Sequence, residues 1–411
     1  MKWANPRRLV VRTLAVSVAV FIVQLAVAQS ALSPAVPQAE STPFPADLSR
    51  ATVETTMRRI PAATDLGKWG YQQALFLSSE LLVYKRTGDK RYLDYVKSWA
   101  DAHVDPDGKI DRSIDALDYI LPGSLMLTLY KETGDKRYAI AAQTIRRRLD
   151  TYPRTEDGAL WHATSRQHQL WLDGTYMSLP FLIRYGEAFD ERKYAYDEAT
   201  KQLLLYADHL NDSSTGLLFH AYDESGAQPW ADPKTHHSSV FWARSIGWYG
   251  MALIDVLETL PKDHPNRPKL IALVRQLAKA YATYQDPTTG LWFNVVNQPQ
   301  QASNWLETSA SSMYVYLLEK AVERGYIGAQ YRRVACKGYH GVLSQVTATP
   351  DGEIHIANIC DGTNVGQLQF YLDRPRKTDD LHGLGAFILM NEVMRQSPCA
   401  QSSNSTNWFA K

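Results

Sequence analysis

The sequence has few cysteines and no excess of charge of either sign. Three of its 411 residues are cysteine, and 44 lysines and arginines nearly balance 43 aspartates and glutamates. Cys336, Cys360 and Cys399 form no C-x-x-C pair, so we expect no zinc site, one disulfide at most and one thiol left over. No basic stripe is present, which argues against nucleic acid as a partner.

The sequence also lacks an apolar run of comfortable membrane-spanning length. A short run at 14–28 follows Lys2, Arg7, Arg8 and Arg12, and it ends in Ala-Val-Ala. A basic start, a short apolar run and an A-x-A end are typical of a secretory signal peptide. We therefore predict a signal peptide at 1–28, cleaved after Ala28, and an exported protein, periplasmic or secreted, without a stable membrane anchor.

No internal stretch rich in Gly, Ser or Pro divides the rest of the chain. We predict a flexible linker at 29–45, one catalytic domain at 46–396, and a flexible tail at 397–411 that is rich in Ser and Asn. An internal repeat lies in this domain: Thr-Gly-Asp-Lys-Arg-Tyr occurs at 87–92 and again at 133–138. Its Gly suits the end of one helix and its Asp the N-cap of the next, so each copy predicts a tight joint between two helices.

Apolar periodicity predicts about twelve helices, with short joints within pairs and longer links between pairs. A repeated helical hairpin of this kind closes naturally into an all-α (α/α)6 barrel, with an open solenoid as the alternative. The predicted helices span 48–60, 70–86, 89–102, 116–131, 135–150, 174–187, 190–210, 242–259, 266–284, 307–324, 327–345 and 380–395.

Six clusters of polar and aromatic residues lie at the starts of alternate helices. Helix N-termini present free N–H groups and the positive end of the helix dipole, which favour an anionic ligand. Six clusters in step therefore predict a ring of inner helices that converge on one cavity. The clusters are 69–71, Asp115 with Asp118, 171–173, 242–244, 307–309, and 379–380 with His382.

Asp173 and Asp118 are the strongest candidates for acid–base chemistry. Asp173 could instead cap its helix, as Asp often does, and Asp115 could cap the helix that follows it. If Asp118 and Asp173 both face the cavity, burial and mutual repulsion should raise the pKa of one of them toward neutrality and provide a general acid.

Other polar residues have both structural and functional interpretations. Arg244, between two tryptophans, could pack on an indole ring at the surface or bind a carboxylate through two parallel hydrogen bonds. His162 and His220 each follow an aromatic residue at equivalent places in the repeat, which favours a role at the site. No histidine pair has metal-ligand spacing with a carboxylate partner, so we expect no metal. Ser309 lacks the G-x-S-x-G context of a serine hydrolase.

Four segments in the same order resemble a known family. The stretches at 171–181, 241–249, 290–292 and 307–313 are similar to the unsaturated rhamnogalacturonyl hydrolases of glycoside hydrolase family 105, close to the unsaturated glucuronyl hydrolases of family 88. The resemblance covers about 47–395. One departure is Ser245-Ile246, where many relatives have Gly-Asn, and this puts the fine shape of the pocket and the substrate preference in question.

The resemblance implies roles for individual residues and a reaction. Asp173 would be the general acid/base and Asp118 its carboxylate partner. The other matching residues would surround the uronate, the attacking water and the sugar ring: His220, Arg244, His162, Trp171, Met177, Trp242 and Trp248, with Tyr71 as a further substrate-binding candidate. The substrate would be an unsaturated uronyl oligosaccharide, a product of rhamnogalacturonan lyases. The enzyme would release the 4,5-unsaturated uronic acid from its non-reducing end by hydration of the C4=C5 enol ether, with no cofactor.

Three other functions remain open at this point. A related hydrolase could act on unsaturated glucuronyl ends, such as those from ulvan or other acidic polysaccharides. A saturated-sugar glycosidase or a sugar epimerase could share the fold, although an epimerase would want several histidines on the inner helices. An exported glycan-binding protein without activity could keep the aromatic residues, but it would not need Asp118 together with Asp173.

Overall fold

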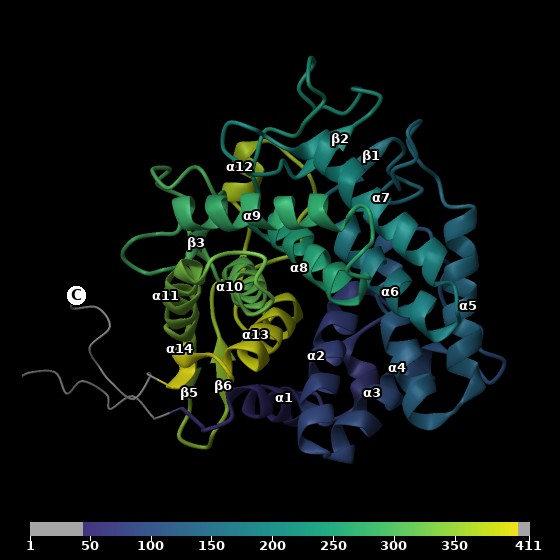
Figure 1. Cartoon of the computed structure of the whole chain (residues 1–411). Coiled ribbons are helices and arrows are strands. Elements are labelled where there is room, and N and C mark those ends of the chain that lie inside the picture. Colours follow the sequence, from purple (N-terminus) through teal and green to yellow (C-terminus); the bar gives the residue numbers. More distant parts are fainter. Residues whose placement is uncertain (1–43, 402–411) are drawn as a thin grey trace, which may run out of the picture. The chain divides into compact units, whose positions relative to one another are not determined.

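The computed structural model describes residues 44–401 of the chain. The predicted signal peptide and nearly all of the predicted linker lie outside these residues, as does 402–411. Twelve helices form six consecutive pairs in this part of the chain (Figure 1). They are α1 (Leu48–Arg59), α2 (Tyr71–Thr87), α3 (Lys90–His103), α4 (Gly123–Thr133), α5 (Lys136–Asp150), α6 (Gly174–Ala188), α7 (Arg192–Leu210), α8 (Ala243–Thr259), α9 (Arg267–Tyr284), α10 (Thr308–Glu323), α11 (Arg332–Leu343) and α13 (Leu381–Met394).

Alternate helices form a closed inner ring. In order, α2, α4, α6, α8, α10 and α13 each pack against the next, and α13 packs against α2. The other six helices lie outside; in Figure 1, α5 and α11 are at the periphery while α8, α10 and α13 are central. The predicted (α/α)6 barrel is confirmed, and closure of the ring excludes the open solenoid.

Sequence explains which helices lie inside. Helix α8 is buried without interruption from Ala243 to Ile254, as expected of a helix that is surrounded by others. Helix α3 buries one side only, through Tyr92, Tyr95, Val96 and Trp99.

The repeated hexapeptide forms the predicted joints. Gly88 adopts a left-handed conformation with φ 73°, and its N–H donates to the carbonyl of Tyr84. Asp89 then caps α3 by accepting from the N–H of Arg91. Gly134 and Asp135 repeat the arrangement between α4 and α5. Gly permits the positive φ at low cost, and the Asp carboxylate satisfies a free helix N–H.

The fourth predicted helix begins later than expected. A 3-10 turn, η2 (Leu117–Tyr119), precedes α4, whose N-cap is Pro122. Proline restricts the residue before it and has no N–H to donate, so the helix starts after it. Asp115 caps no helix; its carboxylate accepts from the Ser113 hydroxyl.

Long links between the pairs carry four two-stranded antiparallel sheets and the short helix α12 (Leu368–Leu372). The sheet that matters most for the site pairs β1 (Gln169–Trp171) with β2 (Ala221–Asp223), with Trp171 opposite Ala221. The other sheets are β3 (Trp292–Phe293) with β4 (Leu306–Glu307), β5 (Val346–Ala348) with β6 (Ile354–Ile356), and β7 (Ile359–Cys360) with β8 (Arg376–Lys377).

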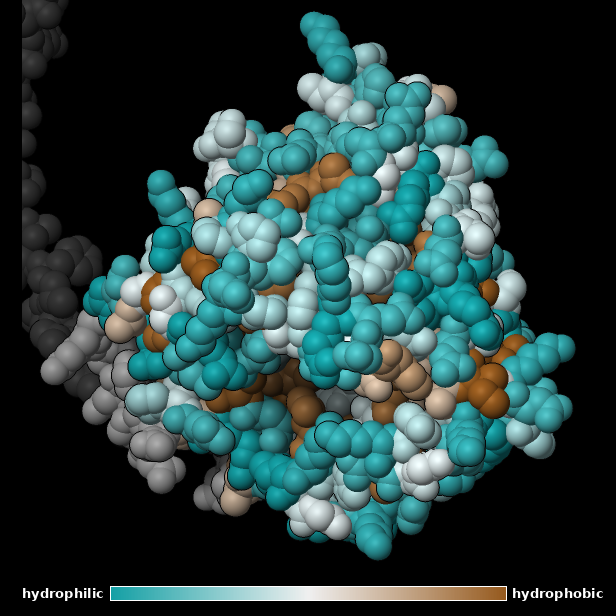
Figure 2. Space-filling model, turned by 45° about the vertical axis from the view of Figure 1, so that its right-hand side comes forward, coloured by the Kyte–Doolittle hydropathy of each residue, from teal (hydrophilic) through white to brown (hydrophobic). Residues whose placement is uncertain are grey.

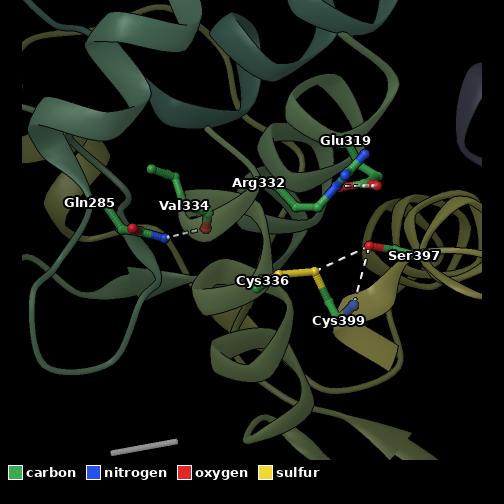
Figure 3. Close-up of a disulfide and its surroundings, with 7 residues drawn as sticks. All are labelled: Gln285, Glu319, Arg332, Val334, Cys336, Ser397 and Cys399. Atoms are coloured by element: carbon green, nitrogen blue, oxygen red, sulfur yellow. Dashed lines mark hydrogen bonds and ion pairs between the residues drawn. A yellow bond between two sulfur atoms is a disulfide. The ribbon is translucent and has the colours of Figure 1, made fainter. Parts of the chain in front are cut away.

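One disulfide joins Cys336 on α11 to Cys399 on α14 (Pro398–Gln401), as Figure 3 shows. Cys360 is the free and buried thiol of the described chain. The first residues of the predicted tail therefore differ from expectation. The sulfur of Cys399 is fixed to an outer helix and accepts from the Ser397 hydroxyl, so 397–401 belong to the folded domain.

The surface in Figure 2 is mostly hydrophilic, with hydrophobic residues visible inside a hollow. Within 44–401, no helix combines the length and the apolar character needed to cross a membrane.

Candidate active site

A cavity of about 330 Å³ lies beside the N-terminal ends of inner helices α2 and α6 and the turn before α4. Six predicted site residues line it together: Tyr71, Asp118, His162, Trp171, Asp173 and Met177. The segments 163–166 and 362–364, which lie between helix pairs, complete the wall. The sequence clusters at the starts of these inner helices therefore do converge on one cavity.

Asp173 is at the N-cap position of α6, yet its side chain accepts no helix N–H. Its Oδ2 atom instead lies 3.1 Å from Nε2 of His220. Backbone pairing brings the two residues together, because the N–H of Leu172 donates to the carbonyl of His220 beside the β1–β2 sheet. The capping interpretation of Asp173 thus fails, and its carboxylate is available to the cavity.

His220 is fully buried, and side chains on the side away from Asp173 fix its ring. Its Nδ1 atom lies 2.6 Å from the hydroxyl of Tyr371 on α12, and its ring lies 4.7 Å from that of Trp242. A phenol hydroxyl that donates to Nδ1 leaves the proton on Nε2, facing Asp173. Sequence reasoning missed Tyr371, because α12 lies in a link between helix pairs where no apolar periodicity indicates a helix or its position near the site.

The two carboxyl groups have opposite pKa shifts. Burial and the negative charge of Asp173 raise the pKa of Asp118 to about 7, although Arg166 opposes this. Burial also acts to raise the pKa of Asp173, but contact with His220 outweighs it and leaves that pKa below its ordinary value. The expected separation of two pKa values is present, and the neutral carboxyl group at the site is Asp118.

His162 lines the cavity as a neutral ring. Burial lowers its pKa to about 4, and its Nε2 atom lies 3.8 Å from Oδ1 of Asp118. It stacks on Trp171 with ring centres 4.4 Å apart. The guanidinium of Arg166 lies 4.2 Å from the Trp171 ring and donates to Asn364. Arg166 lies in a loop without periodicity or a motif, so no local pattern pointed to it.

Arg244 is positioned differently from the expectation. Its side chain is buried and does not line the cavity. Both terminal nitrogens donate to backbone carbonyls, those of Cys360 and Asp361, and the guanidinium lies 4.9 Å from the Trp242 ring. In this structure Arg244 therefore stabilises the backbone just before residues 362–364, which line the cavity. Its guanidinium group does not face the cavity in a position to bind a carboxylate.

Trp248 and Tyr71 connect the cavity to the core. Trp248 is fully buried, stacks on Tyr176 at 5.1 Å and meets the edge of Tyr71 at 6.4 Å. The Tyr71 hydroxyl lies 2.7 Å from Nε2 of His382, whose other ring nitrogen contacts Asp380. Contact with His382 holds the pKa of Asp380 at about 2 against the effect of burial. Trp242 and Trp248 thus support the site from behind.

Among residues 44–401, no cluster of three or more His, Cys, Asp or Glu side chains could hold a metal ion. The chemistry that these residues offer is acid–base chemistry on a ligand that fits beside two carboxyl groups, an arginine and stacked aromatic rings.

Comparison with known proteins identifies the family of this chain. Residues 48–396 match the model of Glycosyl Hydrolase Family 88, so the fold and site define a glycoside hydrolase of this type. A solved family 105 glycoside hydrolase from C. acetobutylicum ATCC 824 is 34% identical, with a TM-score of 0.81, over 84% of this chain and 99% of that one. The chain belongs to glycoside hydrolase family 105, which is related to family 88, and it is an enzyme.

Two curated relatives are similar over about half of the chain. Protein Atu3128 of Agrobacterium fabrum is 33% identical over 52% of this chain and 96% of its own length. The unsaturated rhamnogalacturonyl hydrolase YesR of Bacillus subtilis is 28% identical over 56% of this chain and 64% of its own length.

Proposed function

We propose that the enzyme removes the 4,5-unsaturated uronic acid from the non-reducing end of rhamnogalacturonan lyase products. The observation that carries the proposal is the pair of cavity-lining carboxyl groups, Asp118 and Asp173, one neutral and one ionised, in a family 105 fold. The name of the relative from Bacillus subtilis supports this substrate class. The predicted signal peptide fits a polymer-derived substrate outside the cytoplasm.

The proposed reaction is hydration of an enol ether. A proton adds to C4 of the unsaturated sugar, and positive charge develops across C5 and the ring oxygen. Water then adds at C5 while a base takes its proton. The resulting hemiketal opens by breaking the bond between C5 and the ring oxygen, and the glycosidic bond is lost as the product rearranges. One carboxyl group can act first as acid and then as base, because the two proton transfers are sequential.

We assign both transfers to Asp173. The ionised form of Asp173 predominates before substrate binds, so it must first gain a proton. Solvent supplies this proton through the cavity that the carboxylate lines, and Nε2 of His220, 3.1 Å away, orients the carboxylate. Asp118, neutral below about pH 7, adds no second negative charge beside an anionic sugar. The sugar ring would stack within the aromatic wall formed by Trp171 and its neighbours.

The test follows the ultraviolet absorbance of the unsaturated uronate, which disappears on hydration. Wild-type enzyme should consume unsaturated galacturonyl-rhamnose, and Asp173→Asn should bind it but lower kcat at least about a thousandfold, as expected for the loss of a group that performs both proton transfers. Wild-type-like turnover by Asp173→Asn would disprove the assignment. Consumption of an unsaturated glucuronyl substrate instead would keep the reaction and change the sugar. A folded wild-type enzyme that consumes neither would refute the proposed function.

A further inference from the structure

A second cavity adjoins the proposed catalytic one. It has a volume of about 340 Å³ and shares Tyr71, Asp118 and Tyr119 with the first cavity. Its remaining wall comes from the start of α2 and the residues before it, together with Arg112. A ligand that fills the first cavity can therefore continue past Tyr119 into the second.

The second cavity has two cations that lack a carboxylate partner. Neither Lys68 nor Arg112 forms an ion pair with any Asp or Glu in the part of the chain that the structure describes. Arg137, by contrast, contacts both Asp101 and Asp135. Two unpaired cations beside one cavity favour an anionic group of the ligand.

The side chains that surround Arg112 are fixed by several contacts. The Arg112 guanidinium lies 4.0 Å from the centre of the Tyr119 ring and donates to its hydroxyl. The Trp69 indole donates to the Tyr119 carbonyl at 2.9 Å, and Trp69 stacks on Trp99 at 5.7 Å. Arg112 therefore presents its charge from a fixed position, which reduces the entropy that is lost when a ligand binds.

Two loop segments in the wall of the first cavity are bridged to each other. Arg166 donates to Asn364 at 2.9 Å and so joins the two loop segments of the wall. The part of a longer substrate beyond the cleaved bond can instead extend along the residues that the two cavities share, toward Lys68 and Arg112.

We propose that the second cavity is a subsite for a uronic acid two sugars beyond the terminal unsaturated residue. Rhamnogalacturonan alternates uronic acid with rhamnose, so a tetrasaccharide product of a lyase carries its second carboxylate on the third sugar. The unsaturated sugar occupies the first cavity, the neutral rhamnose passes Tyr119, and the next carboxylate binds Arg112 and Lys68. This inference rests on the proposed function and makes the enzyme selective for tetrasaccharides over disaccharides.

The test compares kcat/KM for three substrates: the unsaturated disaccharide, the tetrasaccharide, and a tetrasaccharide whose third-sugar carboxyl is reduced to an alcohol. We expect the wild type to prefer the acidic tetrasaccharide over the disaccharide by about tenfold, as a charge-assisted contact predicts. The reduced tetrasaccharide should lose this preference, and high salt should weaken it.

Two variants separate the cations. Lys68→Gln and Arg112→Gln should each lower the ratio of tetrasaccharide to disaccharide kcat/KM, and the double variant should bring it near one. Lys68 is exposed, so its substitution spares the packing that Arg112 makes on Tyr119. Arg333→Gln, an exposed arginine on outer helix α11, is the matched control and should keep the wild-type ratio.

Each outcome decides the inference. A wild type that cleaves the disaccharide with no preference for the acidic tetrasaccharide, or variants that leave the ratio intact, would overturn the subsite and leave the proposed function standing. A folded wild type that cleaves none of the three substrates would overturn the proposed function and the subsite with it.

Discussion

Replacing Asp118 with Asn should stabilise the protein, and the gain should depend on pH. The folded-state pKa of Asp118 is about 7, against 3.8 for an exposed aspartate, a difference of about 3 units. Below about pH 4 the carboxyl group is protonated in both states, so the substitution should have little effect. Between about pH 4 and pH 7 the unfolded chain ionises while the folded chain keeps its proton, and the wild type loses stability relative to the variant.

The expected magnitude follows from this difference in pKa. At 1.36 kcal/mol per unit, 3 units correspond to an upper limit of about 4 kcal/mol. The Asp118 side chain is 27% exposed, so water screens part of the effect. We therefore expect Asp118→Asn to raise the free energy of unfolding by about 2 kcal/mol at pH 8.

The assay is urea unfolding of the wild type and the variant at pH 4, 5.5, 7 and 8. Asp115→Asn makes the same chemical change at an exposed position of the same segment and reports the effect of the substitution itself. The gain of Asp118→Asn should grow from pH 4 to pH 7 and then level off. A gain that is the same at all four pH values, or a loss that grows with pH, would refute the assignment of a raised pKa to this group.

The remaining predictions concern activity and a second buried carboxyl group. If neutral Asp118 is required, kcat/KM should fall about tenfold per pH unit above about pH 7, and a profile that is flat from pH 6 to 9 would contradict this. Burial raises the pKa of Glu80 well above its ordinary value, and neither of its carboxyl oxygens has a hydrogen-bond partner among residues 44–401. Glu80→Gln should therefore raise the free energy of unfolding at pH 7, by up to about 1.4 kcal/mol per unit of pKa difference, and leave it unchanged at pH 4. Equal effects at both pH values in urea unfolding would exclude a raised pKa of Glu80. Arg244→Lys replaces a guanidinium that donates from two nitrogens with a single ammonium group. Amide hydrogen exchange at 360–364 should become faster, and kcat/KM should fall about tenfold for the disaccharide and the tetrasaccharide alike. A change in KM for one substrate only would indicate that Arg244 binds that substrate directly.

Much of the fold could be predicted because local rules suffice for it. The joints at Gly88 and Gly134 combine a left-handed glycine with an aspartate cap, and both features are local to a few residues. Apolar periodicity separates inner from outer helices for the same reason. The start of α4 was misplaced because the pattern at 116–131 looks helical throughout, whereas Pro122 delays the helix and leaves Asp118 on a 3-10 turn.

The site was predicted less completely because its partners come from distant segments. The aromatic clusters indicated which helix ends meet, and six of the ten predicted residues do line one cavity. No local pattern could reveal that Arg244 donates to carbonyls at 360 and 361, or that Tyr371 lies behind His220. Both contacts depend on how the link before α13 folds back over the ring.

The opposite pKa shifts of Asp118 and Asp173 suit the two carboxyl groups to different roles in the reaction. A group that both gives and takes a proton must reach substrate and water, and Asp173 does so because its carboxylate lines the cavity, while Nε2 of His220 lies 3.1 Å from it and favours its ionised form. A group that keeps its proton up to about pH 7 cannot serve as the base that deprotonates water at lower pH, and this describes Asp118. Asp118 is better suited to lower the negative charge that an anionic sugar meets, while Asp173 carries the proton transfers. The stability gain expected for Asp118→Asn and the turnover loss expected for Asp173→Asn are thus two consequences of one electrostatic arrangement: the same burial that destabilises the first carboxyl group makes it compatible with the substrate that the second one acts on.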